Sequence, residues 1–247
     1  MSRYKPYPNY KPSGVEWLGD VPEHWEVKPI KRAFQIIGGS TPKAGDPTFW
    51  DGDLVWVTPA DLSKLESKWI DDSGRKITLK GLASCGSHLV PPGAIILSTR
   101  APIGSMAIAS KQLCTNQGCK SLIPSRNANT DYFAYYLSAC VEQLSVRGKG
   151  TTFLELSGDE LGAFEGIAPP PSEQSAIAAF LDRETSRIDA LVEKKRRFIE
   201  LLREKRQALI TAAVTGKLDV RTGKPYPKYK PSGVEWLGDV PEHWEVK

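Results

Sequence analysis

The chain has 247 residues, of which 40% are hydrophobic and 25% charged, and its formal net charge at pH 7 is +4. That length allows one large domain or two modest ones, and so small a charge neither requires nor excludes a nucleic-acid partner. No run of about 18 apolar residues occurs, and the N-terminus lacks the apolar core of a secretion signal. We therefore expect a cytoplasmic protein with no membrane partner.

The first element is a segment that the chain carries twice. Residues 5–28 (copy 1) and 224–247 (copy 2) are identical at 23 of 24 positions, and Asn9 of copy 1 corresponds to Lys228 of copy 2. The copies lie too far apart for a solenoid, whose repeats recur about every 20 to 50 residues. Each copy is rich in proline and holds two tryptophans. We expect an extended, polyproline-II-like segment whose indoles dock on a neighbouring surface.

Residues 29–171 alternate short apolar runs with turn signals such as Pro91-Pro92-Gly93. The predicted strands are Leu54–Val57, Ala94–Ser98, Met106–Ala109 and Cys119–Ile123. A helix is predicted over Asp131–Val146, with Thr130 as its cap. The pattern is typical of a compact mixed α/β or mostly β domain. Together with the helix that follows, it places the chain in the α+β class.

A single long helix is predicted over residues 172–216. No glycine or proline occurs between Pro171 and Gly216, and Ser172-Glu173-Gln174 offers an N-cap. Apolar residues recur at heptad spacing and include Leu181, Ile188, Leu191, Phe198, Leu202 and Leu209. Such a stripe needs to be covered, and no second long helix is predicted in this chain. The pattern therefore indicates a coiled coil with a partner chain.

Motifs for catalysis are missing from the sequence. There is no glycine-rich phosphate-binding loop of either common type. The four cysteines form no Cys-x-x-Cys pair, so we expect reduced, mostly buried thiols rather than metal ligands. Glu193-Lys194-Lys195 lies on the predicted helix, where it is typical of a solvated surface rather than of a nuclease. We therefore expect neither an enzyme nor a metal site.

Several loops between residues 38 and 152 combine hydroxyl, amide and cationic side chains. In DNA complexes Lys, Ser, Thr and backbone N–H groups contact phosphates, whereas Arg pairs with guanine and Asn or Gln with adenine. Turns are built from the same residue types, so each loop alone is weak support for DNA binding.

Taken together, several segments resemble the DNA specificity subunit of type I restriction–modification systems. They are SGVEWLGDVPEHWEV, GGSTPKAG, FWDGDLVWVTPADL, ILSTRAPIG, CTNQG and the long run that begins PPPSEQSAIAAFLDRE and ends at KLD. The resemblance extends over almost the whole chain. It implies a target-recognition domain that reads half of a bipartite DNA site, followed by a helical region that docks modification subunits.

The resemblance divides the chain into four parts. They are an N-terminal segment (1–28), a target-recognition domain (29–171), a helical conserved region (172–216) and a C-terminal segment with the second copy (217–247). Family members usually carry two recognition domains and two helical regions, so this chain has the layout of a half-length subunit. We expect a homodimer through the six apolar residues named above. A two-fold dimer of DNA readers implies an interrupted palindrome as the target.

The resemblance also assigns provisional roles to residues in the loops. Thr41, Lys43, Thr58 and Asp61 would approach the duplex, Arg100, Asn116 and Gln117 would read base edges, and Lys149 and Thr151 would bind phosphates. The implied partners are double-stranded DNA, the methyltransferase (modification) subunit and the restriction subunit. S-adenosylmethionine, ATP and Mg²⁺ are expected only in those partners, so this chain needs no cofactor.

Two other interpretations stay open. The chain could be a truncated specificity fragment that docks methyltransferase, as an interaction or regulatory subunit, without specific DNA binding. It could also be a free-standing nuclease or methyltransferase, which the missing catalytic motifs disfavour. Sequence-specific DNA binding would separate the first interpretation from the homodimer, and metal-dependent cleavage by the chain alone would revive the second.

Overall fold

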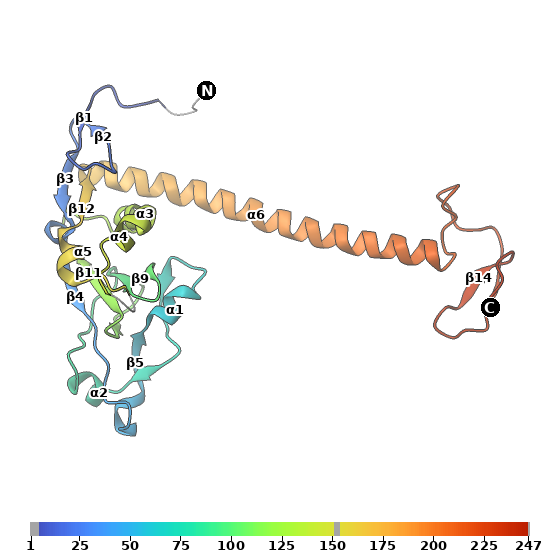
Figure 1. Ribbon diagram of the computed structural model, residues 1–247, viewed down its shortest axis with the longest axis horizontal. Helices are drawn as coiled ribbons and strands as arrows, with labels where there is room; N and C mark the ends of the chain where they lie inside the picture. Colours follow the sequence, from blue (N-terminus) through green and yellow to red (C-terminus); the bar gives the residue numbers. More distant parts are fainter. Residues whose placement is uncertain (1–4, 151–153, 247) are drawn as a thin grey trace. The chain divides into compact units, whose positions relative to one another are not determined.

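The computed structural model describes residues 5–150 and 154–246 (Figure 1). The chain divides into two compact units, residues 1–181 and 182–247. The division falls inside the long helix α6, Pro171–Val214, and the four-part domain layout that the sequence suggests stays a prediction. The first turns of α6 belong to the first unit because Gln174 and Ala178 are buried against it.

Copy 1 forms a small antiparallel β structure. Strand β1 (Tyr10–Pro12) pairs with β2 (Asp20–Pro22), and β3 (Glu26–Pro29) pairs with β12 (Glu165–Ala168). The expectation of a polyproline-II-like segment is therefore wrong over these strands. Proline lacks the N–H that a strand ladder needs, and here it lies at the ends of the short strands, where the ladder tolerates it. The expected docking of the indoles is confirmed for Trp17, whose ring stacks on Phe164.

The domain that follows is built on a five-stranded sheet and a smaller three-stranded one. The large sheet has the order β4-β11-β8-β9-β6 and is antiparallel except for the β6–β9 pair. Its strands are β4 (Phe34–Gly38), β6 (Trp69–Ile70), β8 (Ile95–Thr99), β9 (Ile103–Ala109) and β11 (Cys119–Pro124). The small sheet consists of β5 (Trp50–Val57), β7 (Lys76–Ile77) and β10 (Cys114–Thr115).

Short helices fill the connections of this domain. They are η1 (Ile30–Arg32), η2 (Pro47–Phe49), α1 (Pro59–Ser63), α2 (Leu79–Ala83), α3 (Thr130–Ala139), α4 (Val141–Val146) and α5 (Gly158–Ala163). The four predicted strands match β5, β8, β9 and β11 to within a few residues. The predicted helix over Asp131–Val146 is instead two helices, since Cys140 leaves the helical conformation between α3 and α4. Its N-cap is Asn129 rather than Thr130, because the Asn129 side chain accepts the N–H of Tyr132.

Two hydrophobic clusters cover the two faces of the large sheet. Strand β8 shows the alternation most clearly, because Ile95 and Leu97 belong to one cluster and Ile96 to the other. The first cluster also takes residues from α3, α4, α5 and the start of α6, among them Phe133 and Phe164. The sheet is therefore buried on both faces, and the polar loops at its strand ends are free to carry function.

Helix α6 has 44 residues, which corresponds to about 66 Å of helix at 1.5 Å per residue. It begins at Pro171, so Ser172 lies inside the helix and is not its cap; proline suits the first helical position because it lacks an N–H that would have no helical partner. The domain is thus mixed α/β with a long helix, as predicted. Among the described residues, no helix combines the length and apolar composition that crossing a membrane requires.

The second unit ends in copy 2, which forms the same strand pair as copy 1. Strand β13 (Tyr229–Pro231) pairs with β14 (Asp239–Pro241) in the register of β1 and β2. Lys217 Nζ donates to the Asp239 carbonyl oxygen at 2.6 Å, and the ring of Trp244 lies beside Gly216. Copy 2 therefore packs against the residues that follow α6.

Candidate nucleic-acid interface

The loop at residues 116–118 lies at the centre of the predicted DNA-reading residues. Its neighbours are held by backbone hydrogen bonds: Ser40 N–H donates to Thr115 O at 3.0 Å, Asn116 N–H to Val57 O at 2.9 Å, and Thr99 N–H to Gly118 O at 2.8 Å. The loops that follow β4, β5, β8 and β10 consequently meet at one place. Sequence segments separated by up to 80 residues therefore form a single surface.

Two glycines make this close approach possible. A Cβ atom on Gly39 would lie 2.1 Å from the Asn116 carbonyl oxygen, and one on Gly118 would lie 2.9 Å from Pro59 and 3.0 Å from Arg100 Nε. The backbone oxygen cannot move away from a Cβ atom at residue 39, so that position requires glycine, whereas at residue 118 the side chains of Pro59 and Arg100 would have to shift. The backbone can then bring Arg100 and Asn116 into the same cluster.

Four of the predicted residues come together here. Thr41 Oγ1 donates to Gln117 Oε1, and Asn116 Oδ1 accepts the N–H of Gly118 at 2.9 Å. Arg100 packs beside Gly118 and keeps a third of its side chain exposed. A guanidinium and two amides at one surface supply the hydrogen-bonding groups that read guanine and adenine edges. We call Thr41, Arg100, Asn116 and Gln117 the loop cluster.

Thr58 and Asp61 lie next to the loop cluster but are engaged within their own chain. Asp61 Oδ2 accepts from Thr58 N–H at 2.8 Å and from Thr58 Oγ1 at 2.6 Å, and Oδ1 accepts from Gly74 N–H at 2.9 Å. This capping box starts α1. The bonds give both residues a role in shaping the loop, and their contact with DNA stays a prediction.

The predicted phosphate ligands are spread more widely. Lys43 is exposed, and its carbonyl accepts from Trp50 Nε1 at 3.3 Å. Lys149 Nζ lies 2.5 Å from Glu160 Oε1, and hydrogen bonding to Lys149 is the largest cause that holds the pKa of Glu160 below its usual range. Thr151 lies outside the described residues. A phosphate would have to compete with Glu160 for Lys149.

The sequence analysis missed residues that support the loop cluster. Trp56 Nε1 donates to Ser40 O at 3.0 Å, and Ser87 Oγ donates to Thr115 O at 2.8 Å. Lys120, on β11, places its ammonium group beside Gly38, where it adds a cation to the edge of this surface. The available sequence signal for it was a cation inside the predicted strand Cys119–Ile123.

The cysteines near this surface are buried rather than reactive. Burial raises the pKa of Cys119 to about 12 and that of Cys114 to about 11, so both thiols stay protonated at neutral pH. The four cysteines are free, and three of them are buried, as expected. In the described part of the chain, no three His, Cys, Asp or Glu side chains are grouped so as to hold a metal ion.

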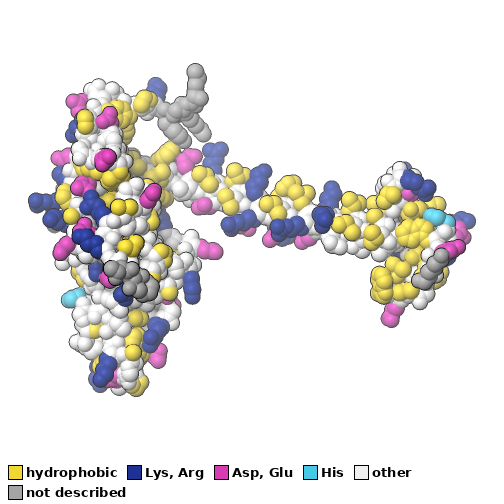
Figure 2. Space-filling model, viewed as in Figure 1, with side chains coloured by type: hydrophobic (Ala, Val, Ile, Leu, Met, Phe, Trp, Pro, Cys, Tyr) yellow, Lys and Arg dark blue, Asp and Glu magenta, His cyan; other side chains and the backbone are white. Residues whose placement is uncertain are grey.

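A second surface runs along α6. Figure 2 shows hydrophobic side chains interleaved with charged ones on this helix. Of the predicted interface residues, Ile188, Leu191, Phe198, Leu202 and Leu209 are each between 48% and 58% exposed, and Leu181 is partly buried. An uncovered apolar stripe of this length is typical of a helix that packs against another chain.

The model of the type I restriction modification DNA specificity domain matches residues 22–201. The type I restriction enzyme MjaIX specificity subunit of Methanocaldococcus jannaschii is 39% identical over 188 residues, which cover 75% of this chain and 42% of the relative. The putative MjaX specificity subunit of the same organism is 29% identical over 208 residues, covering 83% of this chain and 46% of the relative.

A solved structure that describes complex assembly and conformational transition in the type I R-M system has a similar fold. Its TM-score is 0.66 at 24% identity, over 81% of this chain and 48% of that one. The chain thus spans less than half the length of these relatives.

Proposed function

Because the chain belongs to the type I restriction–modification DNA specificity family, we propose that it binds DNA sequence-specifically and reads half of a bipartite site. The observation that carries this proposal is the loop cluster, in which Arg100 from the loop after β8 meets Asn116 and Gln117 from the loop after β10. These side chains have the donors and acceptors that distinguish base pairs in the major groove. Lys43, Lys120 and Lys149 would add contacts to phosphates.

The exposed stripe of α6 supports a homodimer with a coiled-coil seam. From Ile188 to Leu209 its apolar residues follow the heptad spacing and are about half exposed. Two copies joined along this stripe would bring two DNA readers into one particle. A two-fold arrangement of identical readers recognises an interrupted palindrome.

The chain's part in the larger system is to direct partner subunits. The family membership supports docking of a methyltransferase subunit and of a restriction subunit, with the chemistry carried out by those partners. Adenine methylation requires a base flipped out of the duplex, and S-adenosylmethionine, ATP and Mg²⁺ would be bound there. The chain itself would contribute recognition and spacing.

Two measurements test this proposal. Light scattering on the purified chain should give a mass near twice 27.2 kDa, and Phe198→Asp should return it to a monomer. Selection from a random DNA library should then yield an interrupted palindrome. Enrichment of an asymmetric site would contradict the homodimer, and no enrichment at all would favour a docking subunit that does not read DNA.

Arg100→Ala provides the residue-level test. Removing a base-reading arginine should cost about 1–3 kcal/mol and relax one position of the site, whereas removing a phosphate-binding lysine should weaken all sequences alike. Lys43→Ala is the matched comparison. If Arg100→Ala lowers the affinity equally for every sequence, the role assigned to Arg100 is wrong.

A further inference from the structure

One carboxylate joins copy 1 to the first turn of α6. Glu173 Oε1 lies 2.7 Å from His24 Nε2, and Glu173 Oε2 accepts from Trp25 Nε1 at 2.9 Å and from the Tyr7 hydroxyl at 3.2 Å. All three partners come from copy 1, which precedes the recognition domain in the sequence. A carboxylate with three such partners, near the N-terminus of a helix, is well suited to hold the two segments together.

The charge state of Glu173 agrees with this geometry. Partial burial alone would raise the pKa of Glu173, but the hydrogen bonds from Trp25, His24 and Tyr7 outweigh it and hold the pKa below its usual range. The ionised form is therefore the one that the site stabilises.

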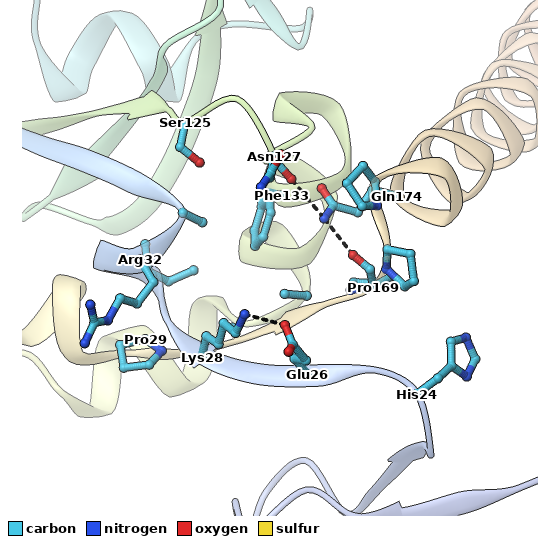
Figure 3. A pocket seen from close by; sticks show the side chains of 16 residues that line it. His24, Glu26, Lys28, Pro29, Arg32, Ser125, Asn127, Phe133, Pro169 and Gln174 are labelled. Carbon is cyan, nitrogen blue, oxygen red and sulfur yellow. Dashed lines mark hydrogen bonds and ion pairs between the residues drawn. The ribbon is translucent and has the colours of Figure 1, made fainter.

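The next residue ties the same turn to the recognition domain. Gln174 is 3% exposed, and its Oε1 accepts the N–H of Asn129 at 2.8 Å. Its Nε2 donates to Pro169 O at 2.8 Å and to Asn127 O at 3.3 Å (Figure 3). Asn129 caps α3, so the start of α6 is fixed to the start of α3.

A cavity of about 270 Å³ lies beside this joint, lined by His24, Phe133, Pro171 and Gln174 among others (Figure 3). Figure 3 shows Gln174 pointing towards Asn127 and Pro169. Within one turn of α6, Glu173 therefore bonds to copy 1 and Gln174 bonds to the recognition domain.

Copy 2 has the same aromatic residues as copy 1 but packs against other residues. Tyr226 lies against His243 and Trp244 much as Tyr7 lies against His24 and Trp25. Yet Trp244 packs beside Gly216. The same aromatic group therefore forms by itself, and in copy 1 Glu173 bonds it to the first turn of α6.

We propose that Glu173 is a positioning residue. It ties copy 1, which is paired to the recognition domain through β3 and β12, to the first turn of α6, and by bracing the domain on the helix in this way it restricts the spacing between half-sites that the dimer accepts. This inference rests on the proposed dimeric DNA reader. Adding one base pair between half-sites shifts the second half-site by about 3.4 Å and rotates it by roughly 35°. A dimer discriminates between such targets only if each reader is held firmly on its helix.

The experiment measures binding of the full chain to duplexes that carry two selected half-sites with spacers varied one base pair at a time. The wild-type chain should prefer one spacer. In Glu173→Gln this preference over the neighbouring spacers should fall by about tenfold, the effect of losing one charge-assisted contact. The base preference within each half-site should stay unchanged, because the loop cluster is untouched.

Matched variants separate positioning from general damage. Glu200→Gln breaks an exposed pair with Arg197 on the same helix and should leave the spacer profile intact. His24→Ala should broaden the profile, whereas its copy 2 counterpart His243→Ala should not. Glu173→Asp keeps the charge on a shorter side chain; it should give an intermediate profile and serves if Glu173→Gln does not fold.

The two proposals fail in different ways. A wild-type chain without sequence or spacer preference would overturn the proposed function and this inference with it. A spacer-selective wild-type chain whose profile is unchanged in both Glu173→Gln and Glu173→Asp would overturn the role of Glu173 alone.

Discussion

Copy 1 and copy 2 have almost the same sequence and the same local fold but different neighbours. In both copies a serine hydroxyl oxygen accepts the N–H of the valine two residues later at 3.1 Å (Ser13 and Ser232). In both, a tyrosine N–H also donates to the hydroxyl of the tyrosine three residues later at 3.1 Å (Tyr7 and Tyr226). Val21 and Val240 are both buried. The folding of the segment is therefore local and set by its own residues.

The neighbours differ because they come from elsewhere in the chain. Trp17 of copy 1 stacks on Phe164 at 5.6 Å, whereas its counterpart Trp236 is 81% exposed. Strand β3 of copy 1 pairs with β12, a partner that lies only in the first unit. Nearly identical segments thus acquire different environments from residues 164–173 in one case and from residues 216–219 in the other.

Phe164→Ala should have the largest effect on the difference between the two copies. Phe164 is fully buried in the main hydrophobic cluster and forms the platform for Trp17. Its truncation should lower the free energy of unfolding of the first unit by about 3–5 kcal/mol, as measured by denaturant titration. Hydrogen exchange in copy 2 should not change, and faster exchange there would mean that the two copies are coupled.

Trp17→Ala should have a smaller effect, because this indole is partly exposed. We expect a loss of about 2 kcal/mol from buried area and ring stacking. Trp236→Ala is the matched control and should change the stability by less than about 0.5 kcal/mol, as surface substitutions generally do. Equal losses from the two variants would show that Trp236 has a docking surface as well.

Glu173→Gln should cost about 1 kcal/mol at pH 7, since the carboxylate is hydrogen-bonded but part of it faces solvent. In the folded chain, burial opposes ionisation, yet the bonds from Trp25, His24 and Tyr7 keep the pKa of Glu173 low. A depressed pKa stabilises the fold above the unfolded value of 4.5, and this contribution disappears as the pH falls through the folded pKa.

The difference in free energy of unfolding between wild-type and Glu173→Gln chains should therefore shrink as the pH falls below 4.5. Denaturant titrations at several pH values measure it. Glu200→Gln should show no such trend, since it removes only an exposed ion pair. A difference that grows as the pH falls below 4.5 would contradict the assignment of the ionised carboxylate to the joint.

The sequence predicted those parts of the fold that depend on local pattern. Strands such as Ile95–Thr99 and the helix Pro171–Val214 are marked by runs of apolar residues and by the absence of breakers. The break at Cys140 was missed because no glycine or proline announces it. The strand pair of copy 1 was missed because a proline-rich sequence is typical of a polyproline II helix, whereas these prolines lie at the ends of short strands.

The candidate site was predictable in residue type but not in arrangement. Arg100 stood out because it lies at the end of a predicted strand, and Asn116 and Gln117 because they place two side-chain amides together. That Gly39 and Gly118 let their loops meet depends on contacts distant in sequence. Glu173 was noted only as part of the start of a helix, because its three hydrogen-bond partners are 148 to 166 residues away in the sequence.

Asn9→Lys tests the comparison with the smallest expected effect. It makes copy 1 identical to copy 2, in which Lys228 Nζ lies 3.9 Å from Glu242 in an exposed pair. The stability should change by less than about 0.5 kcal/mol, and the fluorescence of Trp17 and Trp25 should keep the signature of the docked segment. A variant that releases copy 1 from Phe164 and Glu173 would place the distinction between the copies in this one residue. If copy 1 stays docked, the distinction lies in the neighbours, since the two segments then have no difference in sequence left.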